Sequence, residues 1–333
     1  MKGRFAPSPT GRMHLGNVYS ALLSWLSAKS QGGQWVLRIE DLDPQRSRLE
    51  YARQVEDDLR WLSLVWDEGG LSGARSSSAA DSYVQSLRGE VYAHYLDKLT
   101  AQGLTYPCYC TRADIMATQA PHESDGRIVY AGTCRPGELK IKNEKLKIKS
   151  EKLKNEGLVG ERLTNGRKPS TRLLVPDEDI IFVDGHYGTQ SVNLARHCGD
   201  FVLRRADGAW AYQLAVVVDD ALMGITEVVR GRDLLLSAPQ QIYLYRLLGF
   251  DVPQFCHLPL LCNQQGQRLC KRDRSLDLGY IRQTGSTPQQ VIGQLAFWAG
   301  LIDRPDPVSP ADLVAGFAWS KVPVRDILLP STT

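Results

Sequence analysis

The sequence has 333 residues, of which 43% are hydrophobic and 23% are charged. This is the composition of an ordinary globular protein, long enough to build one large or two modest domains around a substantial core. The formal net charge is +3, and residues 138–156 account for all of it with seven lysines against four glutamates. Because the remainder sums to zero, a basic field over the whole protein cannot be an argument for nucleic-acid binding, and any such surface must be a local patch.

The expected compartment follows from the lack of a membrane span or a signal peptide pattern in the sequence. No stretch approaches the ~20 apolar residues that span a bilayer. The N-terminus runs directly into an apolar strand, without the pattern of a signal peptide. Seven cysteines in such a chain indicate reduced thiols or a metal site rather than a disulfide scaffold. We therefore expect a cytoplasmic protein.

The N-terminal stretch combines a short apolar strand, a tight loop and the start of a helix. Pro7 and Pro9 hold the loop extended. Apolar residues then recur at helical spacing: Leu15, Val18, Ala21, Leu22, Trp25 and Leu26. Free backbone N–H groups and the positive end of the helix dipole converge at such a junction, where Gly11 and Gly16 allow close approach and His14 offers an imidazole. This pattern favours a phosphate site, although a surface loop before an amphipathic helix has the same spacing.

The residues of this loop carry a family resemblance. The run Arg4-Phe5-Ala6-Pro7-Ser8-Pro9-Thr10-Gly11, followed by His14-Leu15-Gly16-Asn17, resembles the HIGH signature of class I aminoacyl-tRNA synthetases in its glutamate-specific form. His14 and Gly16 match the signature, whereas Asn17 departs from it. The resemblance implies a Rossmann-type α/β catalytic domain in which His14, Gly16 and Asn17 bind ATP.

A second strand is predicted at residues 35–40, and an acidic cluster of Glu40, Asp41 and Asp43 follows its last apolar residue. Ligands bind beyond the carboxyl ends of parallel strands, so this cluster could hold an ammonium group. Alternatively, Asp43 caps the helix predicted at residues 46–64, and both roles are compatible. By resemblance, Glu40 corresponds to the family residue that binds the amino group of glutamate.

Three cysteines lie in one short region: Cys108, Cys110 and Cys134. This region follows a helix predicted at residues 83–102, which ends at Gly103. Zinc requires four tetrahedral ligands, and spacing alone allows His122 as the fourth or three buried cysteines without a metal. The Cys-x-Cys…Tyr-x-x-x-Cys arrangement is similar to a zinc site of the glutamyl-Q tRNA(Asp) synthetases, and this resemblance implies Tyr130 as the fourth ligand.

A lysine-rich heptad repeat follows at residues 139–156. Leu and Ile are its only apolar residues, and about two and a half copies are too few for a stable coiled coil. The lysines could contact RNA, but we expect a solvated insertion that folds little. A collapse of tRNA affinity after deletion of residues 140–155 would contradict this expectation.

A hairpin is predicted at residues 200–214 with Asp207-Gly208 as its turn. A buried strand at residues 225–231 then places Arg230 at its end, where a guanidinium can pair bidentately with a carboxylate, although a surface ion pair has the same pattern. The run resembles the glutamate-site segment of glutamyl-tRNA synthetase-like enzymes. The resemblance implies that glutamate is bound by Arg4, Ala6, Ser8, Glu40, Tyr212 and Arg230. The two arginines would meet its two carboxylates, in an order that the sequence leaves open.

Residues 233–248 predict an amphipathic helix, residues 252–261 lead into a strand, and residues 263–267 turn the chain. The run Arg268-Leu269-Cys270-Lys271-Arg272 resembles the KMSKS loop of class I synthetases, and Lys271 is the residue that matches. A solvated surface loop is the alternative. The resemblance implies that Lys271 and His14 stabilise the charge on the ATP phosphates, with magnesium, while the carboxylate of glutamate attacks.

Two short helices are predicted at residues 288–301 and 310–317, after which the sequence leaves no room for a helical anticodon-reading domain. The overall resemblance is therefore to the glutamyl-Q tRNA(Asp) synthetases, a ligase family that transfers activated glutamate to queuosine in the anticodon loop of tRNA(Asp). It implies tRNA-independent activation of L-glutamate by ATP, a zinc ion and a monomer.

The expected fold is α/β. Residues 1–102 and 169–262 would form the Rossmann-type catalytic domain, residues 103–168 a zinc-bearing insertion, and residues 263–333 the KMSKS-like loop and a helical tail. Two alternatives stay open: a truncated glutamyl-tRNA synthetase that charges the 3′ end of tRNA(Glu), and a zinc-containing RNA-binding protein without catalysis, which the departures at Asn17, Arg268 and Cys270 motivate. Glutamate-dependent ATP–pyrophosphate exchange without tRNA distinguishes an enzyme from a binder.

Overall fold

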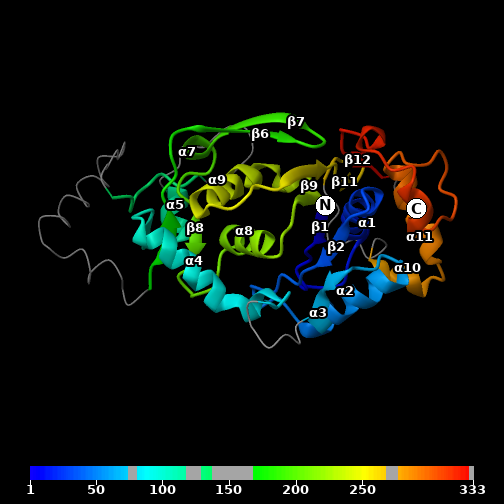
Figure 1. Ribbon diagram of the computed structural model, residues 1–333, viewed down its shortest axis with the longest axis horizontal. Coiled ribbons are helices and arrows are strands. Elements are labelled where there is room, and N and C mark those ends of the chain that lie inside the picture. Colours follow the sequence, from blue (N-terminus) through cyan, green and yellow to red (C-terminus); the bar gives the residue numbers. More distant parts are fainter. Residues whose placement is uncertain (74–80, 118–128, 137–167, 268–276, 330–333) are drawn as a thin grey trace, which may run out of the picture.

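The computed structural model describes the chain apart from residues 74–80, 118–128, 137–167, 268–276 and 330–333. The molecule is elongated, with the C-terminal helices at one end of its long axis and α5 (Arg112–Ala117) toward the other (Figure 1). No helix in the described ranges is long and apolar enough to cross a bilayer.

The fold is built on parallel strands joined by helices. A three-stranded parallel sheet has the order β1 (Lys2–Phe5), β2 (Gln34–Leu37) and β3 (Glu68–Gly69). α1 (Leu15–Ser30) connects β1 to β2, and α2 (Leu49–Trp61) connects β2 to β3, which is followed by α3 (Gly70–Gly73). These are the crossover connections that parallel pairing requires. The predicted α/β class is thus confirmed.

A second parallel ladder joins β9 (Glu227–Gly231) and β10 (Gln254–Leu258), with η3 (Arg232–Ser237) and α9 (Ala238–Leu248) between them. Lys2 N donates to Thr226 Oγ1 over 2.8 Å, and Thr226 N donates to Lys2 O over 2.9 Å. The ladder therefore lies beside β1. The loops that leave β1, β2, β9 and β10 meet at one edge, where an open α/β sheet holds its ligand.

Antiparallel elements flank these ladders. β4 (Thr105–Cys108), β5 (Ser170–Leu173) and β8 (Val202–Arg204) form one sheet, and β6 (Asp179–Asp184) and β7 (Gly188–Asn193) form a hairpin. The accompanying helices are η2 (Gln85–Arg88), α4 (Gly89–Ala101), α7 (Leu194–His197) and α8 (Tyr212–Leu222).

The C-terminal part carries α10 (Leu278–Gln283), α11 (Pro288–Trp298), α12 (Pro310–Val314) and η5 (Trp319–Lys321). β11 (Leu261–Cys262) pairs with β12 (Ile327–Leu328), which ties the end of the described chain back to the centre. The side chains of Thr287 and Ser309 cap α11 and α12, which confirms the two helices predicted there.

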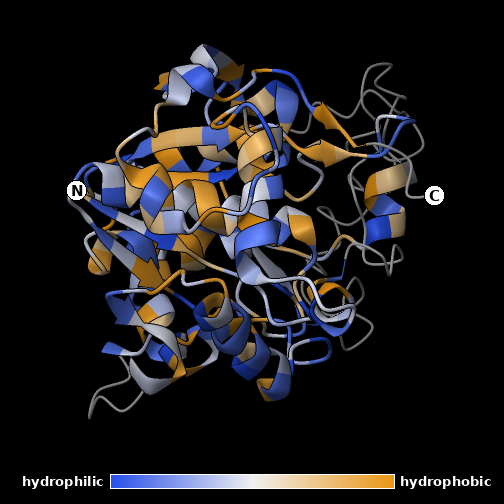
Figure 2. Cartoon of the chain, turned by 90° about the vertical axis from the view of Figure 1, so that its right-hand side faces the viewer, coloured by the Kyte–Doolittle hydropathy of each residue, from blue (hydrophilic) through white to orange (hydrophobic). Residues whose placement is uncertain are grey.

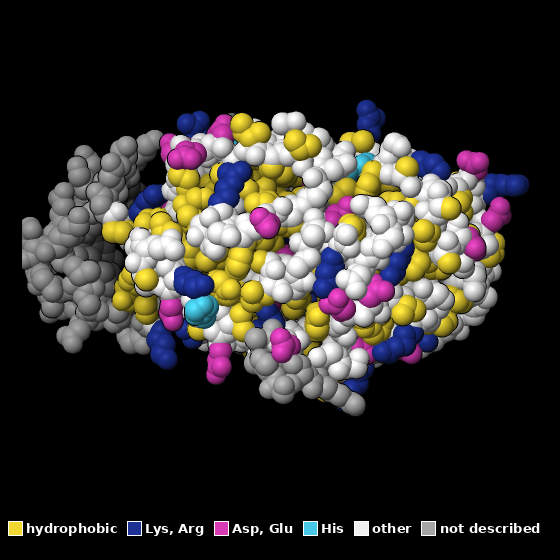
Figure 3. All heavy atoms as spheres, viewed as in Figure 1, with side chains coloured by type: hydrophobic (Ala, Val, Ile, Leu, Met, Phe, Trp, Pro, Cys, Tyr) yellow, Lys and Arg dark blue, Asp and Glu magenta, His cyan; other side chains and the backbone are white. Residues whose placement is uncertain are grey.

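The two largest apolar clusters among the described residues stabilise the molecule. One packs α1 and the first sheet against the C-terminal helices, and the other packs α4, α8 and α9 around β9 and β10. Strands at the centre of the molecule are correspondingly coloured largely orange in Figure 2. On the face seen in Figure 3, the described Lys and Arg side chains are interspersed with Asp and Glu, in keeping with the nearly neutral charge outside residues 138–156.

The predicted hairpin at residues 200–214 is wrong in its second arm. Its turn is present, since Gly208 has a φ of +88° and Arg205 N donates to Ala209 O over 2.9 Å. Only a single bridge, Arg204 to Trp210, continues the pairing, and Tyr212 begins α8. α8 packs against both α4 and α9, so its apolar residues surround the helix and mimic a buried strand in the sequence.

Candidate active site

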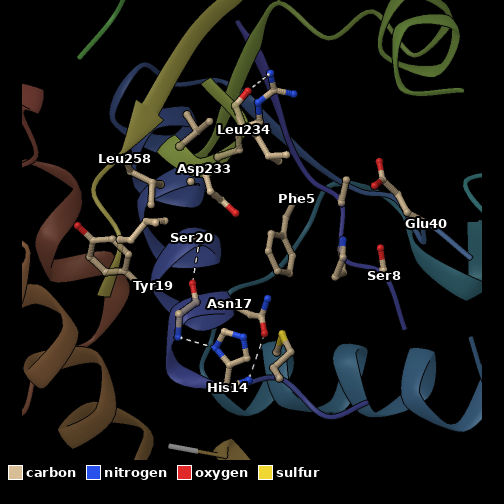
Figure 4. Close-up of a pocket in the computed structure, with 18 of the residues that line it drawn as sticks. Phe5, Ser8, His14, Asn17, Tyr19, Ser20, Glu40, Asp233, Leu234 and Leu258 are labelled. Atoms are coloured by element: carbon tan, nitrogen blue, oxygen red, sulfur yellow. Dashed lines mark hydrogen bonds between the residues drawn. The ribbon is translucent and has the colours of Figure 1, made fainter. Parts of the chain in front are cut away.

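A cavity of about 420 Å³ opens at the edge where the parallel strands end. It is lined by every described residue to which the sequence assigned glutamate or ATP: Arg4, Ala6, Ser8, His14, Gly16, Asn17, Glu40, Tyr212 and Arg230. Figure 4 shows His14 and Asn17 at the start of α1 on one side of this cavity, and Glu40 and Ser8 on another. Residues more than two hundred positions apart therefore share one site.

The loop before α1 caps the start of this helix. His14 is the N-cap, its Nδ1 accepts from Gly16 N over 3.1 Å, and the Asn17 side chain accepts from His14 N over 3.2 Å (Figure 4). Because Nδ1 is an acceptor, a neutral His14 ring carries its proton on Nε2. The first turn of α1 contains no acidic residue, so no side-chain carboxylate there offsets the positive end of the dipole. Asn17, the position that departs from the family signature, thus has a defined capping role.

Glu40 sits in a buried ionic network. Its Oε1 accepts from Arg38 Nη2 over 3.1 Å. Arg38 Nη1 also donates to Asp220 Oδ1 over 2.6 Å, and Arg4 Nε lies 3.4 Å from the same oxygen. Arg4, Arg38, Glu40 and Asp220 are all less than 9% exposed. Asp220 therefore holds both arginines in place, and Arg4 lines the cavity itself.

Burial and charge act in opposite directions on these carboxyls. Burial raises the pKa of Glu40, and the nearby Arg38 and Arg4 offset this only in part. At Asp220 burial also acts upward, but Arg38 and Arg4 outweigh it and lower the pKa. Glu40 is thus the carboxylate of the network that would gain most from a further cation in the cavity.

Arg230 differs from the other buried arginines in its partners. Its Nε donates to His257 Nε2 over 3.0 Å, its Nη1 to Gln241 Oε1 over 2.7 Å, and its Nη2 to the Leu234 carbonyl over 3.2 Å. All three partners are neutral acceptors in this geometry. Burial lowers the pKa of Arg230. Burial acts in the same direction on Arg38, but the carboxylates of Asp220, Glu40 and Asp219 outweigh it and raise the pKa of Arg38. Arg230 is therefore a buried cation that lacks charge compensation from its hydrogen-bond partners, which favours an anionic ligand.

Several lining residues were not predicted from the sequence: Arg12, Tyr19, Ser20, Asp233, Leu234 and the segment 258–261. Asp233 and Leu234 lie in η3, which follows β9, and the segment 258–261 begins with the last residue of β10. The rule that ligands lie beyond strand ends could have found them. Arg12 and Tyr19 flank the recognised motif and carry no comparable sequence signal.

Lys271 lies outside the described residues. The chain lines the cavity at Leu261. After the segment that is not described, the backbone of Asp277 forms an isolated antiparallel β-bridge with His14. α10 is then fixed to α2, because Arg282 Nη1 lies 2.6 Å from both Asp57 Oδ2 and Asp58 Oδ1, and Asp58 also binds Arg12. The described residues before and after Lys271 therefore reach this cavity at Leu261 and contact His14 at Asp277.

A second cluster joins Cys108, Cys110 and Cys134, whose Sγ atoms all lie within 4.8 Å of one another. The Tyr130 hydroxyl lies 3.4 Å from Cys108 Sγ and 3.9 Å from Cys110 Sγ. Hydrogen bonds from Cys110 and Cys134 lower the pKa of the Cys108 thiol. The structure thus brings Tyr130 to the cysteines, whereas His122 lies outside the described residues.

The six described cysteines are free thiols: Cys108, Cys110, Cys134, Cys198, Cys256 and Cys262. This agrees with the expectation that the chain is not a disulfide scaffold.

Comparison with known proteins places this geometry in a family. Residues 1–299 match the model of the catalytic domain of tRNA synthetases class I (E and Q). The chain is 46% identical over 337 residues to a glutamyl-Q tRNA(Asp) synthetase of Symbiobacterium thermophilum, covering 99% of this chain and 96% of that protein. It is 44% identical over 332 residues to one of Nitratidesulfovibrio vulgaris, with the same coverage of 99% and 96%.

A solved structure agrees with these sequence relatives. The glutamate tRNA ligase of Elizabethkingia meningosepticum, crystallised in complex with its amino acid, superposes with a TM-score of 0.74 at 30% identity, over 97% of this chain and 65% of that one. The HIGH-like loop, the parallel strands and the full-length similarity all agree. The chain belongs to the class I tRNA synthetases of the glutamate and glutamine branch, and is a ligase of the aminoacyl-tRNA synthetase type.

Proposed function

We propose that the protein activates L-glutamate with ATP, without tRNA, and transfers the glutamyl group to queuosine in the anticodon loop of tRNA(Asp). Glutamate activation is supported by one observation: two buried residues of opposite charge line the same cavity. Arg230 is a guanidinium with neutral hydrogen-bond partners, and Glu40 is a carboxyl group whose pKa is raised by burial. Transfer to queuosine is supported by the similarity to two glutamyl-Q tRNA(Asp) synthetases. They are 44–46% identical to this chain, which covers 96% of their length.

In this proposal the cavity is complementary to a dicarboxylic amino acid. The ammonium group of glutamate pairs with Glu40, and a carboxylate pairs with Arg230, whose hydrogen-bond partners among the described residues are all neutral. Arg4 lines the same cavity but is already 3.4 Å from Asp220, so it serves as the second, partly compensated cation. Tyr212, Ala6 and Ser8 line the remaining wall. A neutral or cationic amino acid would leave Arg230 uncompensated.

ATP would bind at the start of α1. Gly16 and Asn17 line the cavity at this point, and the positive helix end together with the Nε2–H of His14 suits phosphate oxygens. Lys271 would approach from the segment that returns beside His14 at Asp277. The α-carboxylate of glutamate then attacks the α-phosphorus, the bond to the pyrophosphate leaving group breaks, and the cationic groups stabilise the charge that develops. Magnesium would accompany ATP, because it prefers phosphate oxygens and water to an all-protein cage.

In the second step a hydroxyl of the modified base attacks the acyl carbon of the adenylate and AMP leaves. No covalent bond to the protein is needed. A protein that consumes ATP and acts on tRNA works where both are made, so the cytoplasm is the proposed compartment. The division into a catalytic domain, an insertion at residues 103–168 and a tail from residue 263 is likewise part of the proposal. A monomer remains our prediction.

The cluster at residues 108–134 is the proposed zinc site. Zinc bound to thiolates at about 2.3 Å in a tetrahedron separates its sulfur ligands by roughly 3.8 Å. Cys110 Sγ and Cys134 Sγ are 3.6 Å apart, and the Tyr130 oxygen is 3.4 Å and 3.9 Å from two of the sulfurs. These spacings fit three cysteines and Tyr130 as the ligands. When bound, zinc would hold β4 to the segment around residue 134 and thereby stabilise the fold.

Glutamate-dependent ATP–pyrophosphate exchange without tRNA tests activation. Transfer of labelled glutamate to tRNA(Asp) with and without queuosine then tests the acceptor. We expect Arg230→Gln to abolish exchange at physiological glutamate, whereas Arg232→Gln, which removes a cation paired with Asp326 at the surface, should leave exchange unchanged. Charging of tRNA(Glu) at its 3′ end would favour the truncated glutamyl-tRNA synthetase instead. RNA binding without any exchange would favour a protein that does not catalyse.

A further inference from the structure

A buried histidine lies behind Arg230, outside the cavity that ligands would enter. His257 is 0% exposed, and its ring stacks against Phe255 with a centroid separation of 6.2 Å. It stands opposite Arg230 in the parallel register of β10 and β9, so the two side chains project from adjacent strands to the same face. This register is the reason that the ring reaches the guanidinium.

The hydrogen bonds of His257 specify one protonation state. Arg230 Nε, which always carries a hydrogen, donates to His257 Nε2 over 3.0 Å. His257 Nε2 must therefore be an unprotonated acceptor. The other ring nitrogen, Nδ1, lies 2.5 Å from Asp184 Oδ2 and can make this contact only as a donor. The ring in this geometry is the neutral tautomer with its proton on Nδ1.

Asp184 is held as a carboxylate by donors from one strand and a turn. It accepts from the backbone N–H groups of His186, Tyr187 and His257 as well as from the imidazole. Burial would raise the pKa of Asp184, but the hydrogen bond and charge of His257 and the backbone donors outweigh burial and lower it. The β6–β7 hairpin thus supplies a fixed anionic acceptor that selects the tautomer of His257.

We propose that His257 is a positioning residue for Arg230: fixed by Asp184 as the Nδ1–H tautomer, it aligns the guanidinium for the carboxylate of glutamate, and protonation of the ring releases that alignment. The inference rests on the proposed function of the cavity as a glutamate site. It adds Asp184 and His257 to the groups on which glutamate affinity depends, although neither residue lines the cavity.

The charges around the ring determine when it titrates. From the elements packed against β10, Asp184 on β6 and Arg230 on β9 contact the imidazole, and Arg4 on β1 adds a weaker repulsion. Burial lowers the pKa of His257, Asp184 acts against it, and Arg230 and Arg4 lower it further. The ring is therefore neutral at pH 7 and becomes charged only in acid. Once charged, it presents an N–H to the N–H of Arg230, so a hydrogen bond becomes a repulsion between two cations.

Two variants separate the two nitrogens of the ring. His257→Asn keeps an amide nitrogen at the Nδ1 position, to donate to Asp184, but has no atom at Nε2. His257→Gln can place its amide oxygen at the Nε2 position, to accept from Arg230, and does not titrate. We expect His257→Asn to raise the KM for glutamate about tenfold, the effect of losing one hydrogen bond to a charged group, with the KM for ATP and kcat unchanged. His257→Gln should stay within about threefold of the wild type and restore what the asparagine removes.

The acid dependence provides a second readout. As the pH is lowered below about 6.5, the ordinary pKa of histidine, the KM for glutamate of the wild type should rise more steeply than that of His257→Gln, because only the wild type carries a ring that titrates. The difference between the two proteins isolates His257 from Glu40, which both retain. Nitrogen NMR of protein with labelled histidine should show His257, identified by its absence in His257→Gln, as the Nδ1–H tautomer at pH 7.5.

Failure of this inference can be told apart from failure of the proposed function. A wild type that does not catalyse glutamate-dependent exchange contradicts the glutamate site itself. Exchange by the wild type together with an unchanged KM in His257→Asn overturns only the role of His257. If His257→Asn does not fold, two other results would overturn the role of His257. One is an Nε2–H tautomer in the wild type, and the other is a KM for glutamate that depends on pH in the same way in the wild type and in His257→Gln.

Discussion

Replacing Glu40 by Gln tests whether the cavity is built for an amino acid. The amide keeps the shape of the side chain and an oxygen that can still accept from Arg38 Nη2, now 3.1 Å from Oε1, so the substitution removes the charge and little else. Two unit charges 4 Å apart attract by about 4 kcal/mol at an effective dielectric constant of about 20. With about 1.4 kcal/mol for each factor of ten, kcat/KM for glutamate should fall by roughly 10²–10³, while the KM for ATP stays unchanged.

The assay is ATP–pyrophosphate exchange across a range of glutamate concentrations. Asp41→Asn is the matched control, because it removes the same charge from the next residue, whose carboxylate accepts from Ser86 N and Ser86 Oγ. Its kcat/KM should stay within about twofold of the wild type, as for most changes at an exposed site. A Glu40→Gln enzyme with a glutamate KM within threefold of the wild type would refute the ammonium site.

Stability provides an independent check on the same variant. Burial raises the pKa of Glu40 despite Arg38 and Arg4, so its charged form costs free energy in the fold at neutral pH. We therefore expect the free energy of unfolding of Glu40→Gln to equal or exceed that of the wild type, even as activity is lost. A large fall in stability would mean that the activity loss reflects unfolding rather than a missing charge.

The remaining predictions concern the ionic network, the metal site and pH. Asp220→Asn should lower the free energy of unfolding in urea by about 3–5 kcal/mol, because it removes the carboxylate that the buried Arg38 and Arg4 share, whereas Asp207→Asn, at an exposed pair, should change it by less than about 1 kcal/mol; equal effects would refute the argument from burial. Removal of zinc by a chelator, or Cys134→Ser, should lower Tm, and metal analysis of the purified protein should find one zinc per chain; a protein without zinc and an unchanged Tm with chelator would contradict the site. Burial raises the pKa of Glu227 in spite of hydrogen bonds from Ser27 and Gln31, so the stability that the protonated carboxyl allows at low pH is lost as the pH rises through this raised pKa. Glu227→Gln should therefore stabilise the fold by about 1 kcal/mol at pH 8 and have no effect at pH 4. The same effect at both pH values would show that titration is not the cause.

Local patterns were sufficient for much of the scaffold. The strand, loop and helix at residues 2–30, the turn at Gly208 and the stop at Gly103 follow from side-chain size, periodicity and backbone freedom within a few residues. The helix predicted at residues 46–64 begins at Leu49 instead, because Asp43 caps a turn ahead of it through the N–H groups of Gln45 and Arg46. Such errors in helix boundaries arise because a helix cap is a hydrogen bond, and the periodicity of the sequence does not show which N–H group the capping side chain binds.

The sequence by itself determined which residue types stand at the ends of the strands, and hence that a cation-rich and acid-bearing site lies beside a helix N-terminus. Only the tertiary structure decided which charges remain uncompensated: Asp220 on α8 neutralises Arg38 and Arg4, while Arg230 meets the neutral His257 and Gln241. The contacts of Asp220 join segments more than a hundred residues apart, whereas those of Arg230 join segments 11 and 27 residues apart, and in both cases compensation depends on distances of a few ångströms. A one-dimensional pattern contains no such distances, whereas the packing of α8 and the register of β9 with β10 fix them.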